Sequence, residues 1–328
     1  MMGNQIIAPV HLERIPLGET DLQISPLGIG TWQWGDRLVW GYGKEAYTDE
    51  DLQASFDASI QAGINFFDTA EVYGQGRSET LLGRAIRGTT QPLIVATKFM
   101  PFPWRLRASD LSRSLNKSLQ RLGIKPVDLY QIHFPMPPRS VETWGKALIK
   151  AVQAGMTRAV GVSNYDREQM QRMQTVLGRQ GIPLASNQVR YSLLARQPEQ
   201  NGVLEQCKDL GITLIAYSPL AQGLLTGKYT LQNRLHGSRR FSYRKYLTPI
   251  QPLISLMREI GQGQGGKTPA QVALNWVICK GAVPIPGAKN LRQAQENIGA
   301  LGWRLTSEEV KALDHASDQV MKMLGKDH

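Results

Sequence analysis

The sequence predicts an α/β chain folded as one (β/α)8 barrel of the TIM type, and three observations indicate this class. Eight short apolar runs rich in β-branched residues occur along the 328 residues, and amphipathic segments with helical spacing separate them. The runs lack the period-2 alternation of a half-exposed strand, which predicts a parallel sheet covered by helices. Eight such units in this length are typical of the barrel. No linker or shift in composition interrupts the chain, so we expect a single domain over residues 1–328.

The expected elements follow the chain in order. Residues 13–16 and 22–24 flank the turn-forming segment 17–21, which predicts a β-hairpin that closes the bottom of the barrel. The barrel strands are expected at residues 26–32, 64–70, 93–99, 127–133, 158–164, 184–191, 213–220 and 282–288. After the seventh of these, residues 226–248 show no clear periodicity, and a loop of that length in a compact domain is usually functional.

Helix signals agree with this order. One segment between strands carries leucines at helical spacing: Leu111, Leu115, Leu119 and Leu122. Glycines that can end a helix stand before four of the strands: Gly63, Gly123, Gly155 and Gly211. Capping boxes at Thr268 and Thr306 predict the starts of two further helices.

Composition excludes several classes of protein. No apolar run approaches the roughly 18 residues that span a membrane, and the first 20 residues do not resemble a secretory signal. The two cysteines, Cys207 and Cys279, favour a reducing cytoplasm over a disulfide framework, and no Cys/His cluster has the spacing of metal ligands. The net charge of +11 allows a nucleic-acid binder, but the cations are spread among acidic neighbours. A surface that attracts a phosphorylated cofactor explains the charge better, so we expect neither nucleic-acid nor membrane partners.

One motif suggests a different function. Residues 261–268 (GQGQGGKT) match the P-loop of nucleotide triphosphatases and also contain a G-x-G-x-x-G pattern. A P-loop follows a strand, whereas the apolar residues before this segment, from Ile250 to Ile260, recur at helical spacing. A P-loop NTPase is therefore kept only as a remote alternative.

Polar groups end three successive expected strands. Asp68, Lys98 and His133 each follow a buried apolar run, and Tyr73 lies five residues after Asp68. Any one of them, taken alone, is explained by a turn, a solvated side chain or a hydrogen-bonded core histidine. A buried charge needs a partner, and consecutive parallel strands end on the same face, so we expect the four groups to share a site.

These residue types suit the reduction of a carbonyl group by a hydride. The oxygen that becomes negative needs a proton donor, and tyrosine serves if a neighbouring ammonium makes it more acidic than its free pKa of about 10. We expect Lys98 to do this for Tyr73. Asp68 would keep Lys98 charged, and His133 would hydrogen-bond the oxygen or relay the proton.

At this point the chain resembles the aldo-keto reductase family. The matching segments run in order across nearly the whole chain: 27–32 (LGIGTW), 67–74 (FDTAEVYG) with Ser78 and Glu79, 96–98 (ATK), 128–133 (DLYQIH), 161–164 (GVSN), 187–191 (NQVRY), 216–220 (AYSPL) and 285–288 (IPGA). The resemblance implies a barrel, NADP-dependent reduction of aldehydes or ketones, and a catalytic tetrad of Asp68, Tyr73, Lys98 and His133.

The resemblance also implies a site for NADPH. Ser163, Asn164 and Gln188 are expected to hydrogen-bond the carboxamide, and Tyr217 is expected to stack on the nicotinamide ring. Residues expected around the pyrophosphate are Ser218, Pro219, Leu220, Gly223, Leu225, Lys228 and Arg240. Residues expected at the adenosine end are Lys289, Gln293, Glu296 and Asn297. Further residues expected to bind the cofactor are Gly30, Thr31, Trp32, Asp68 and Gly287. Lys289 is the expected partner of the 2′-phosphate, because that charge pairing would favour NADP over NAD.

The substrate pocket departs from the family pattern. Many members carry Trp after the catalytic His, whereas Phe134 and a proline-rich segment stand here. The expected lining is Trp32, Trp34, Phe99, Trp104 and Phe134, and aromatic walls suit flat or apolar aldehydes.

The sequence therefore predicts an NADPH-dependent carbonyl reductase that acts on small molecules as a monomer or weak oligomer. Phrases such as 286–290 (PGAKN) and 301–303 (LGW) look like a plant and cyanobacterial branch that includes pyridoxal reductases, which makes pyridoxal a candidate substrate. The alternative from another class is a cofactor-binding regulatory module, because channel β subunits also resemble this family.

Overall fold

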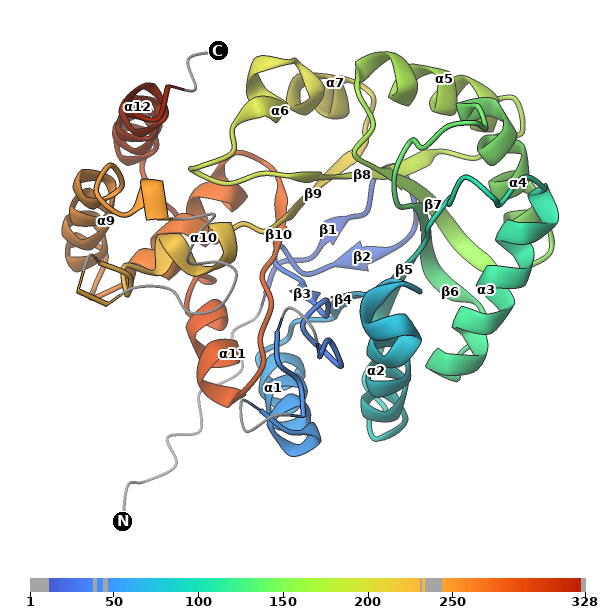
Figure 1. The fold of residues 1–328 in the computed structure, drawn as a ribbon, viewed down its shortest axis with the longest axis horizontal. Coiled ribbons are helices and arrows are strands. Elements are labelled where there is room, and N and C mark those ends of the chain that lie inside the picture. Colours follow the sequence, from blue (N-terminus) through green and yellow to red (C-terminus); the bar gives the residue numbers. More distant parts are fainter. Residues whose placement is uncertain (1–11, 38–39, 44–46, 231, 234–243, 326–328) are drawn as a thin grey trace.

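The structure is a computed structural model that describes residues 12–37, 40–43, 47–230, 232–233 and 244–325. A parallel sheet of eight strands lies at its centre with helices around it (Figure 1). The strands are β3 (Ile29–Gly30), β4 (Phe66–Asp68), β5 (Ile94–Phe99), β6 (Val127–Ile132), β7 (Thr157–Ser163), β8 (Leu184–Arg190), β9 (Thr213–Tyr217) and β10 (Val283–Ile285). The backbone N–H of Gly28 donates to Pro284 O at 3.0 Å and that of Gly30 to Pro286 O at 3.1 Å, which joins the last strand to the first. The predicted (β/α)8 barrel is confirmed.

The helices form an outer layer around these strands (Figure 1). They are α1 (Asp49–Gln61), α2 (Arg77–Arg87), α3 (Ala108–Leu122), α4 (Val141–Gln153), α5 (Arg167–Gly178), α6 (Gln197–Gln200), α7 (Val203–Asp209), α9 (Gln251–Gly263), α10 (Pro269–Cys279), α11 (Leu291–Ile298) and α12 (Ser307–Met323). Three short 3-10 turns are η1 (Tyr73–Gly76), η2 (Ala221–Thr226) and η3 (Arg244–Tyr246). The four leucines expected on one face of α3 are all buried.

Alternation along the strands decides which side chains enter the barrel. Phe66, Ala96 and Leu129 belong to the apolar cluster inside it. Side chains two residues apart on a strand point the same way, so Asp68, Lys98 and Gln131 follow these residues on the inner face. The barrel interior is therefore apolar toward the amino ends of β4, β5 and β6 and polar toward their carboxyl ends.

The expected N-terminal hairpin is present. Strands β1 (Ile15–Pro16) and β2 (Gln23–Ile24) pair antiparallel. Leu17 and Leu22, in and beside its turn, pack into the apolar cluster of the barrel interior. The N–H of Gly18 donates to Thr213 Oγ1 at 2.7 Å, at the start of β9. The hairpin thus closes the end of the barrel opposite the polar layer.

Local signals for the helix ends also hold. The four glycines before strands have φ between 62° and 86°, and both threonine capping boxes form. The glycine-rich segment 261–268 joins the end of α9 to the N-cap of α10. A helix, not a strand, precedes it, which removes the structural context that a P-loop needs. The long loop after β9 begins at η2 and ends near η3, and residues 231 and 234–243 within it lie outside the described residues.

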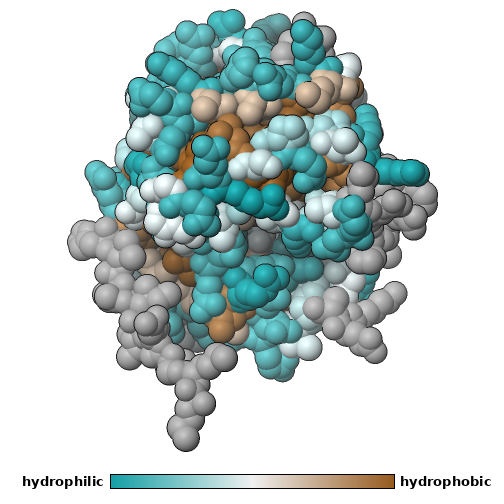
Figure 2. All heavy atoms as spheres, turned by 90° about the vertical axis from the view of Figure 1, so that its left-hand side faces the viewer, coloured by the Kyte–Doolittle hydropathy of each residue, from teal (hydrophilic) through white to brown (hydrophobic). Residues whose placement is uncertain are grey.

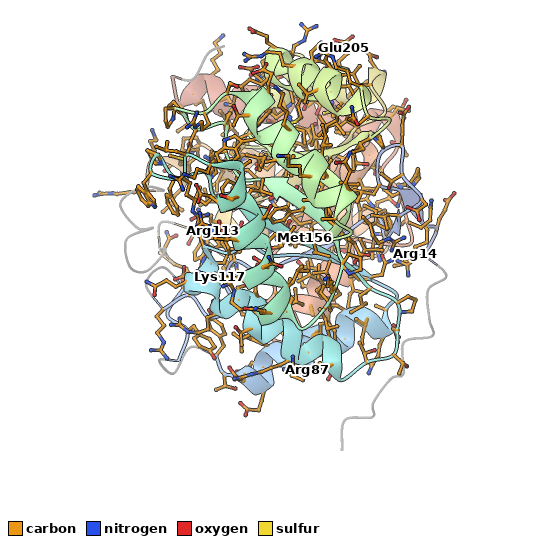
Figure 3. All side chains as sticks on the ribbon, turned by 90° about the vertical axis from the view of Figure 1, so that its right-hand side faces the viewer. Arg14, Arg87, Arg113, Lys117, Met156 and Glu205 are labelled. Atoms are coloured by element: carbon orange, nitrogen blue, oxygen red, sulfur yellow. The ribbon has the colours of Figure 1, made fainter. Side chains whose placement is uncertain are left out.

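The described surface is mixed in charge and hydropathy. Figure 2 shows mainly hydrophilic side chains on the face with α9, α11 and α12, around a smaller apolar area. Arg113 and Lys117 on α3 and Arg87 at the end of α2 lie at the outer surface, spread over separate elements (Figure 3). No helix in the described part of the chain is long and apolar enough to cross a membrane.

Candidate active site

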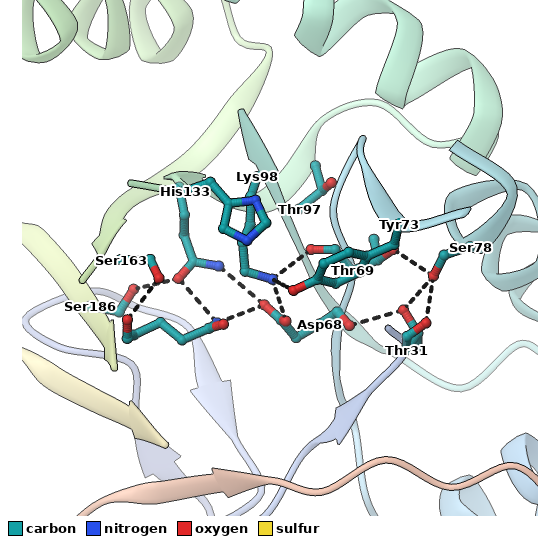
Figure 4. A network of polar contacts seen from close by, with 12 residues as sticks. Thr31, Asp68, Thr69, Tyr73, Ser78, Thr97, Lys98, His133, Ser163 and Ser186 are labelled. Atoms are coloured by element: carbon teal, nitrogen blue, oxygen red, sulfur yellow. Dashed lines mark hydrogen bonds and ion pairs between the residues drawn. The ribbon is translucent and has the colours of Figure 1, made fainter. Parts of the chain in front are cut away.

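The tetrad predicted from the strand ends meets at one point (Figure 4). Lys98 Nζ lies 2.5 Å from Asp68 Oδ1 and donates to Thr69 O at 2.8 Å and to Tyr73 Oη at 3.4 Å. The rings of Tyr73 and His133 meet edge to face with centroids 5.7 Å apart. The arrangement is a chain of contacts from a carboxylate through an ammonium to a phenol.

Burial and charge set the protonation of this chain. Burial alone disfavours a charged Lys98, but Asp68 and Tyr73 more than offset it and raise the pKa of the amine above its ordinary value. Burial raises the pKa of the Tyr73 phenol, and the ammonium of Lys98 offsets part of that rise. The expectation that Lys98 makes Tyr73 more acidic than a free tyrosine is therefore wrong for its net direction. Tyr73 stays protonated at neutral pH and is ready to donate.

His133 is held as a neutral imidazole. Burial, with a smaller effect of Lys98, lowers its pKa to about 3. Phe134 stacks on the ring with centroids 5.3 Å apart, and Asn164 Nδ2 donates to the backbone carbonyl of His133 at 3.2 Å. Its Nδ1 is buried and has no hydrogen-bond partner among the described residues. The ring can offer a hydrogen bond to a ligand, but it carries no charge near pH 7.

A cavity of about 650 Å³ opens above the tetrad, and Tyr73, Asp68 and His133 lie on its wall. Lys98 lies beneath Tyr73 with its side chain fully buried. The wall also contains these residues of the expected cofactor and substrate sites: Gly30, Trp32, Phe134, Ser163, Asn164, Gln188, Tyr217, Ser218, Pro219, Leu220, Gly223, Lys228, Gly287, Lys289, Gln293, Glu296 and Asn297.

The two ends of the cavity differ in chemistry. Next to the tetrad, Tyr217 Oη donates to Asn164 Oδ1 at 3.0 Å, which fixes an amide group beside an aromatic ring. The wall also carries the cations Lys289 and Arg292 at the start of α11 and Lys228 after η2. Lys289 Nζ lies over the ring of Tyr47 at 5.0 Å, which holds the ammonium near the wall. A fixed amide beside an aromatic ring, together with cations elsewhere on the wall, fits a nicotinamide dinucleotide, which carries a carboxamide and phosphates.

Close backbone packing supports this fit. A Cβ at Gly30 would lie 2.8 Å from Ile285 O, so the floor of the cavity needs a glycine. Ser218 and Gln222 have φ of 53° and Gly223 has φ of 97°, so the segment after β9 bends sharply along the wall. Such backbone strain at a cavity is typical of a ligand-binding loop.

Several expected site residues do not reach the cavity. Thr31 is buried, and its hydroxyl donates to Asp68 O at 3.0 Å; Leu225 lies in the hydrophobic core. Trp34 is also buried, and its indole N–H donates to Ala288 O. Phe99 points to the outer side of β5 and packs on Trp144 of α4, because its neighbour Lys98 points inward.

Trp104 is 72% exposed and stacks on Phe102 beyond the cavity wall, so it is also not a lining residue. Arg240 lies outside the described residues.

Of the site residues that were not expected from the sequence, three bear on its chemistry. Met100 replaces Phe99 on the cavity wall, and Arg292 adds a cation in the first turn of α11. Gln131 is fully buried, and its Nε2 donates to Asp68 Oδ2 at 3.2 Å. The alternation Leu129, Gln131, His133 along β6 would have indicated that Gln131 faces the barrel interior.

Comparisons with known proteins place this site in a family. The model of the aldo/keto reductase family matches residues 26–318. The chain is 41% identical over 317 residues to a chloroplastic pyridoxal reductase of Arabidopsis thaliana, covering 92% of this chain and 86% of that protein. It is 32% identical over 327 residues to an L-glyceraldehyde 3-phosphate reductase of Escherichia coli K12, covering 92% and 91%. Among solved structures, the glycerol dehydrogenase of Gluconobacter oxydans superposes with a TM-score of 0.81 at 28% identity, covering 97% and 98%. The chain is an oxidoreductase of carbonyl compounds and belongs to the aldo/keto reductase family.

Proposed function

We propose that the protein reduces aldehydes to alcohols with NADPH and that Tyr73 donates the proton. The observation that carries the proposal is the position of the protonated Tyr73 phenol, backed by Lys98, on the wall of a cavity whose far end is cationic. A bound nicotinamide ring would supply the hydride to the carbonyl carbon.

The residues of the tetrad divide the proton chemistry. The Tyr73 hydroxyl gives its proton to the carbonyl oxygen, and Lys98, 3.4 Å from that hydroxyl, stabilises the phenolate left behind. Asp68 holds the ammonium in place at 2.5 Å. The neutral His133 offers a hydrogen bond to the same oxygen without competing as an acid.

The cations of the cavity support NADPH over NADH. Lys289 and Arg292 lie three residues apart at the start of α11, where the helix N-terminus also favours an anion. An additional phosphate on the ribose would gain charge-assisted hydrogen bonds from this pair.

The substrate end supports a flat, uncharged aldehyde. The wall beside the tetrad carries Trp32, Val72, Met100 and Phe134, and none of these side chains is charged. Pyridoxal is an aromatic aldehyde, and the Arabidopsis relative is named for its reduction. We therefore propose pyridoxal as a substrate, in its unphosphorylated form.

The test is a turnover assay on the purified protein with NADPH or NADH. Absorbance of the reduced nicotinamide is followed with 4-nitrobenzaldehyde, pyridoxal and pyridoxal 5′-phosphate. We expect turnover with NADPH, and a kcat/KM for pyridoxal at least about tenfold above that for its phosphate, because an unpaired phosphate is costly to desolvate. Equal rates on both forms would refute the substrate class.

A lack of turnover on every aldehyde, with NADPH still bound, would instead favour a regulatory cofactor-binding module. Displacement of NADPH by ATP would favour a nucleotide-triphosphate site. The expected cytoplasmic location and monomeric or weakly oligomeric state stay predictions.

A further inference from the structure

The second oxygen of Asp68 has its own partners. While Oδ1 receives Lys98, Oδ2 accepts Gln188 Nε2 at 2.9 Å and Gln131 Nε2 at 3.2 Å (Figure 4). Asp68, Gln131 and Gln188 are all at most 2% exposed. An ionised carboxylate only accepts hydrogen bonds, so both amides present their N–H groups to it. The carboxylate is thus enclosed by three donors in the barrel interior.

The barrel makes room for Gln131. Residue 161, its neighbour on β7, is a glycine, and a Cβ there would lie 3.1 Å from Gln131 Cγ and clash with Ser186 Oγ. Ser186 in turn lies 3.5 Å from Gln131 Oε1, at the limit of a hydrogen bond. A buried amide is costly without partners, and here the neighbouring strands supply the space and the contacts.

We infer that Gln131 is a positioning residue for carbonyl reduction, since its amide N–H holds the second oxygen of Asp68 and so keeps the first oxygen on Lys98. The inference rests on the proposed function. Gln188 also lies on the cavity wall, whereas Gln131 does not. Gln131 therefore acts on the chemistry through its neighbours: its N–H holds Asp68, and its Oε1 lies 3.5 Å from Gln188 Nε2.

Loss of the Gln131 hydrogen bond should affect the proton donor Tyr73 through Asp68 and Lys98. The groups that face Lys98 are Asp68 on β4, Tyr73 on η1 and His133 after β6, and Asp68 is the main group that keeps the amine charged. Without the N–H of Gln131, the carboxylate of Asp68 can turn and move Oδ1 away from Lys98 Nζ, which weakens its attraction for the ammonium. The Lys98–Tyr73 pair should then lose its first proton at a lower pH.

The test uses Gln131→Met, which keeps the length of the side chain but has no N–H to donate. We expect kcat to fall about tenfold, with KM for the aldehyde and Kd for NADPH unchanged within about twofold, because only a proton-transfer contribution weakens. The high-pH limb of the kcat profile should move down by about one pH unit, because an ammonium that is held less closely by Asp68 loses its proton more readily.

A second readout does not depend on activity. With lysine labelled by ¹³C at Cε and the Lys98 signal assigned through Lys98→Arg, NMR follows the amine directly between pH 7 and 11. The signal should begin to titrate about one pH unit lower in Gln131→Met than in the unsubstituted protein. If the unsubstituted protein reduces no aldehyde, the proposed function fails, while this titration still tests Gln131.

A matched control separates this effect from the general loss of a buried amide. Asn275 on α10 is fully buried, donates to Ala300 O and Trp303 O at 2.9 Å, and lies off the cavity wall. Asn275→Leu should lower thermal stability but leave the pH profile and the Lys98 signal in place. If Gln131→Met is unstable, Gln131→Leu tests the same N–H. Unchanged kcat and Lys98 titration in a folded Gln131 variant, or the same shifts in Asn275→Leu, would overturn the inference.

Discussion

At the scale of single residues, the cations of the site occupy two separate places: one is buried beside Tyr73, and others line the cavity wall. Lys98 is fully buried within the tetrad, while Lys289 and Arg292 lie on the cavity wall at the start of α11. In the proposed function, Lys98 supports the proton donor Tyr73, and Lys289 and Arg292 bind a phosphate. A substitution at either place should therefore change one property and spare the other.

Replacing Lys289 with alanine should weaken NADPH much more than NADH. A charge-assisted contact to the 2′-phosphate is worth about 1.5–3 kcal/mol, so the Kd for NADPH should rise at least about tenfold while that for NADH changes little. Fluorescence titration with both cofactors measures this. Lys117→Ala, an exposed cation on α3, is the control. An equal loss for both cofactors would move the phosphate contact away from Lys289.

The histidine predicts how stability depends on pH. Its pKa is about 3 in the folded protein and about 6.5 when unfolded, so between these values the unfolded chain binds the extra proton. The free energy of unfolding therefore decreases as the pH falls below about 6.5. Between pH 7 and pH 5, His133 should account for a decrease of about 2 kcal/mol. Denaturant unfolding measures this at pH 7 and pH 5. The free energy of unfolding of His133→Gln should decrease between these pH values by about 2 kcal/mol less than that of the unsubstituted protein. If both proteins show the same pH dependence, burial does not hold His133 neutral in the folded protein.

At the scale of elements, an ion pair ties the tyrosine-bearing loop to β5. Glu71, two residues before Tyr73, pairs with Arg105 and accepts the N–H of Met100 at 2.7 Å and the Ser114 hydroxyl of α3 at 2.6 Å. The side chains of Glu71 and Arg105 are 9% and 23% exposed, so this contact is partly desolvated. It holds Tyr73 and Met100 in place on the same cavity wall.

Breaking this pair should cost stability and turnover together. Arg105→Ala leaves a buried carboxylate without its main partner, and we expect a loss of about 2 kcal/mol in urea unfolding and a lower kcat. Arg172→Ala, which breaks the exposed Glu142–Arg172 pair, should cost much less stability than Arg105→Ala and spare kcat. Similar losses in both variants would show that the Glu71 contact is an ordinary surface pair.

The same elements show what could be predicted from the sequence. Apolar runs ending in Asp68, Lys98 and His133 are visible because burial dictates both the runs and the pairing of the charges. Phe99 was misplaced and Gln131 was missed because a strand buried on both faces is apolar nearly throughout, which hides the alternation of inward and outward residues. Trp104 lies in a loop, where no periodicity indicates direction, and its stacking on Phe102 follows from tertiary contacts. The net rise in the Tyr73 pKa depends on burial depth, which spacing does not reveal.

At the scale of the whole molecule, the barrel keeps its closed end apart from its reactive end. The hairpin packs into the lower, apolar part of the interior, and the polar layer lies at the carboxyl ends of the strands. Changes at the hairpin should therefore alter stability and leave catalysis intact.

Gly18→Ala tests this separation. Gly18 has φ of 59°, and an added Cβ would lie 2.5 Å from Ala185 O, so both backbone strain and a clash follow. We expect a loss of about 2–3 kcal/mol by denaturant unfolding, with kcat and KM unchanged. Gly155→Ala has a similar φ of 63° but nothing within 4 Å of the new Cβ, so it should cost only about 1 kcal/mol. Equal losses would mean that the hairpin contact is looser than the structure shows.

The most direct test of the central claim is single-turnover reduction of 4-nitrobenzaldehyde by Tyr73→Phe with bound NADPH. The control is Tyr130→Phe, which removes the hydroxyl of a buried tyrosine on β6 that has no hydrogen-bond partner among the described residues. We expect the rate to fall about 10³-fold in Tyr73→Phe with NADPH affinity nearly unchanged, and to change little in Tyr130→Phe. A Tyr73→Phe protein that reduces the aldehyde at the unsubstituted rate would contradict it.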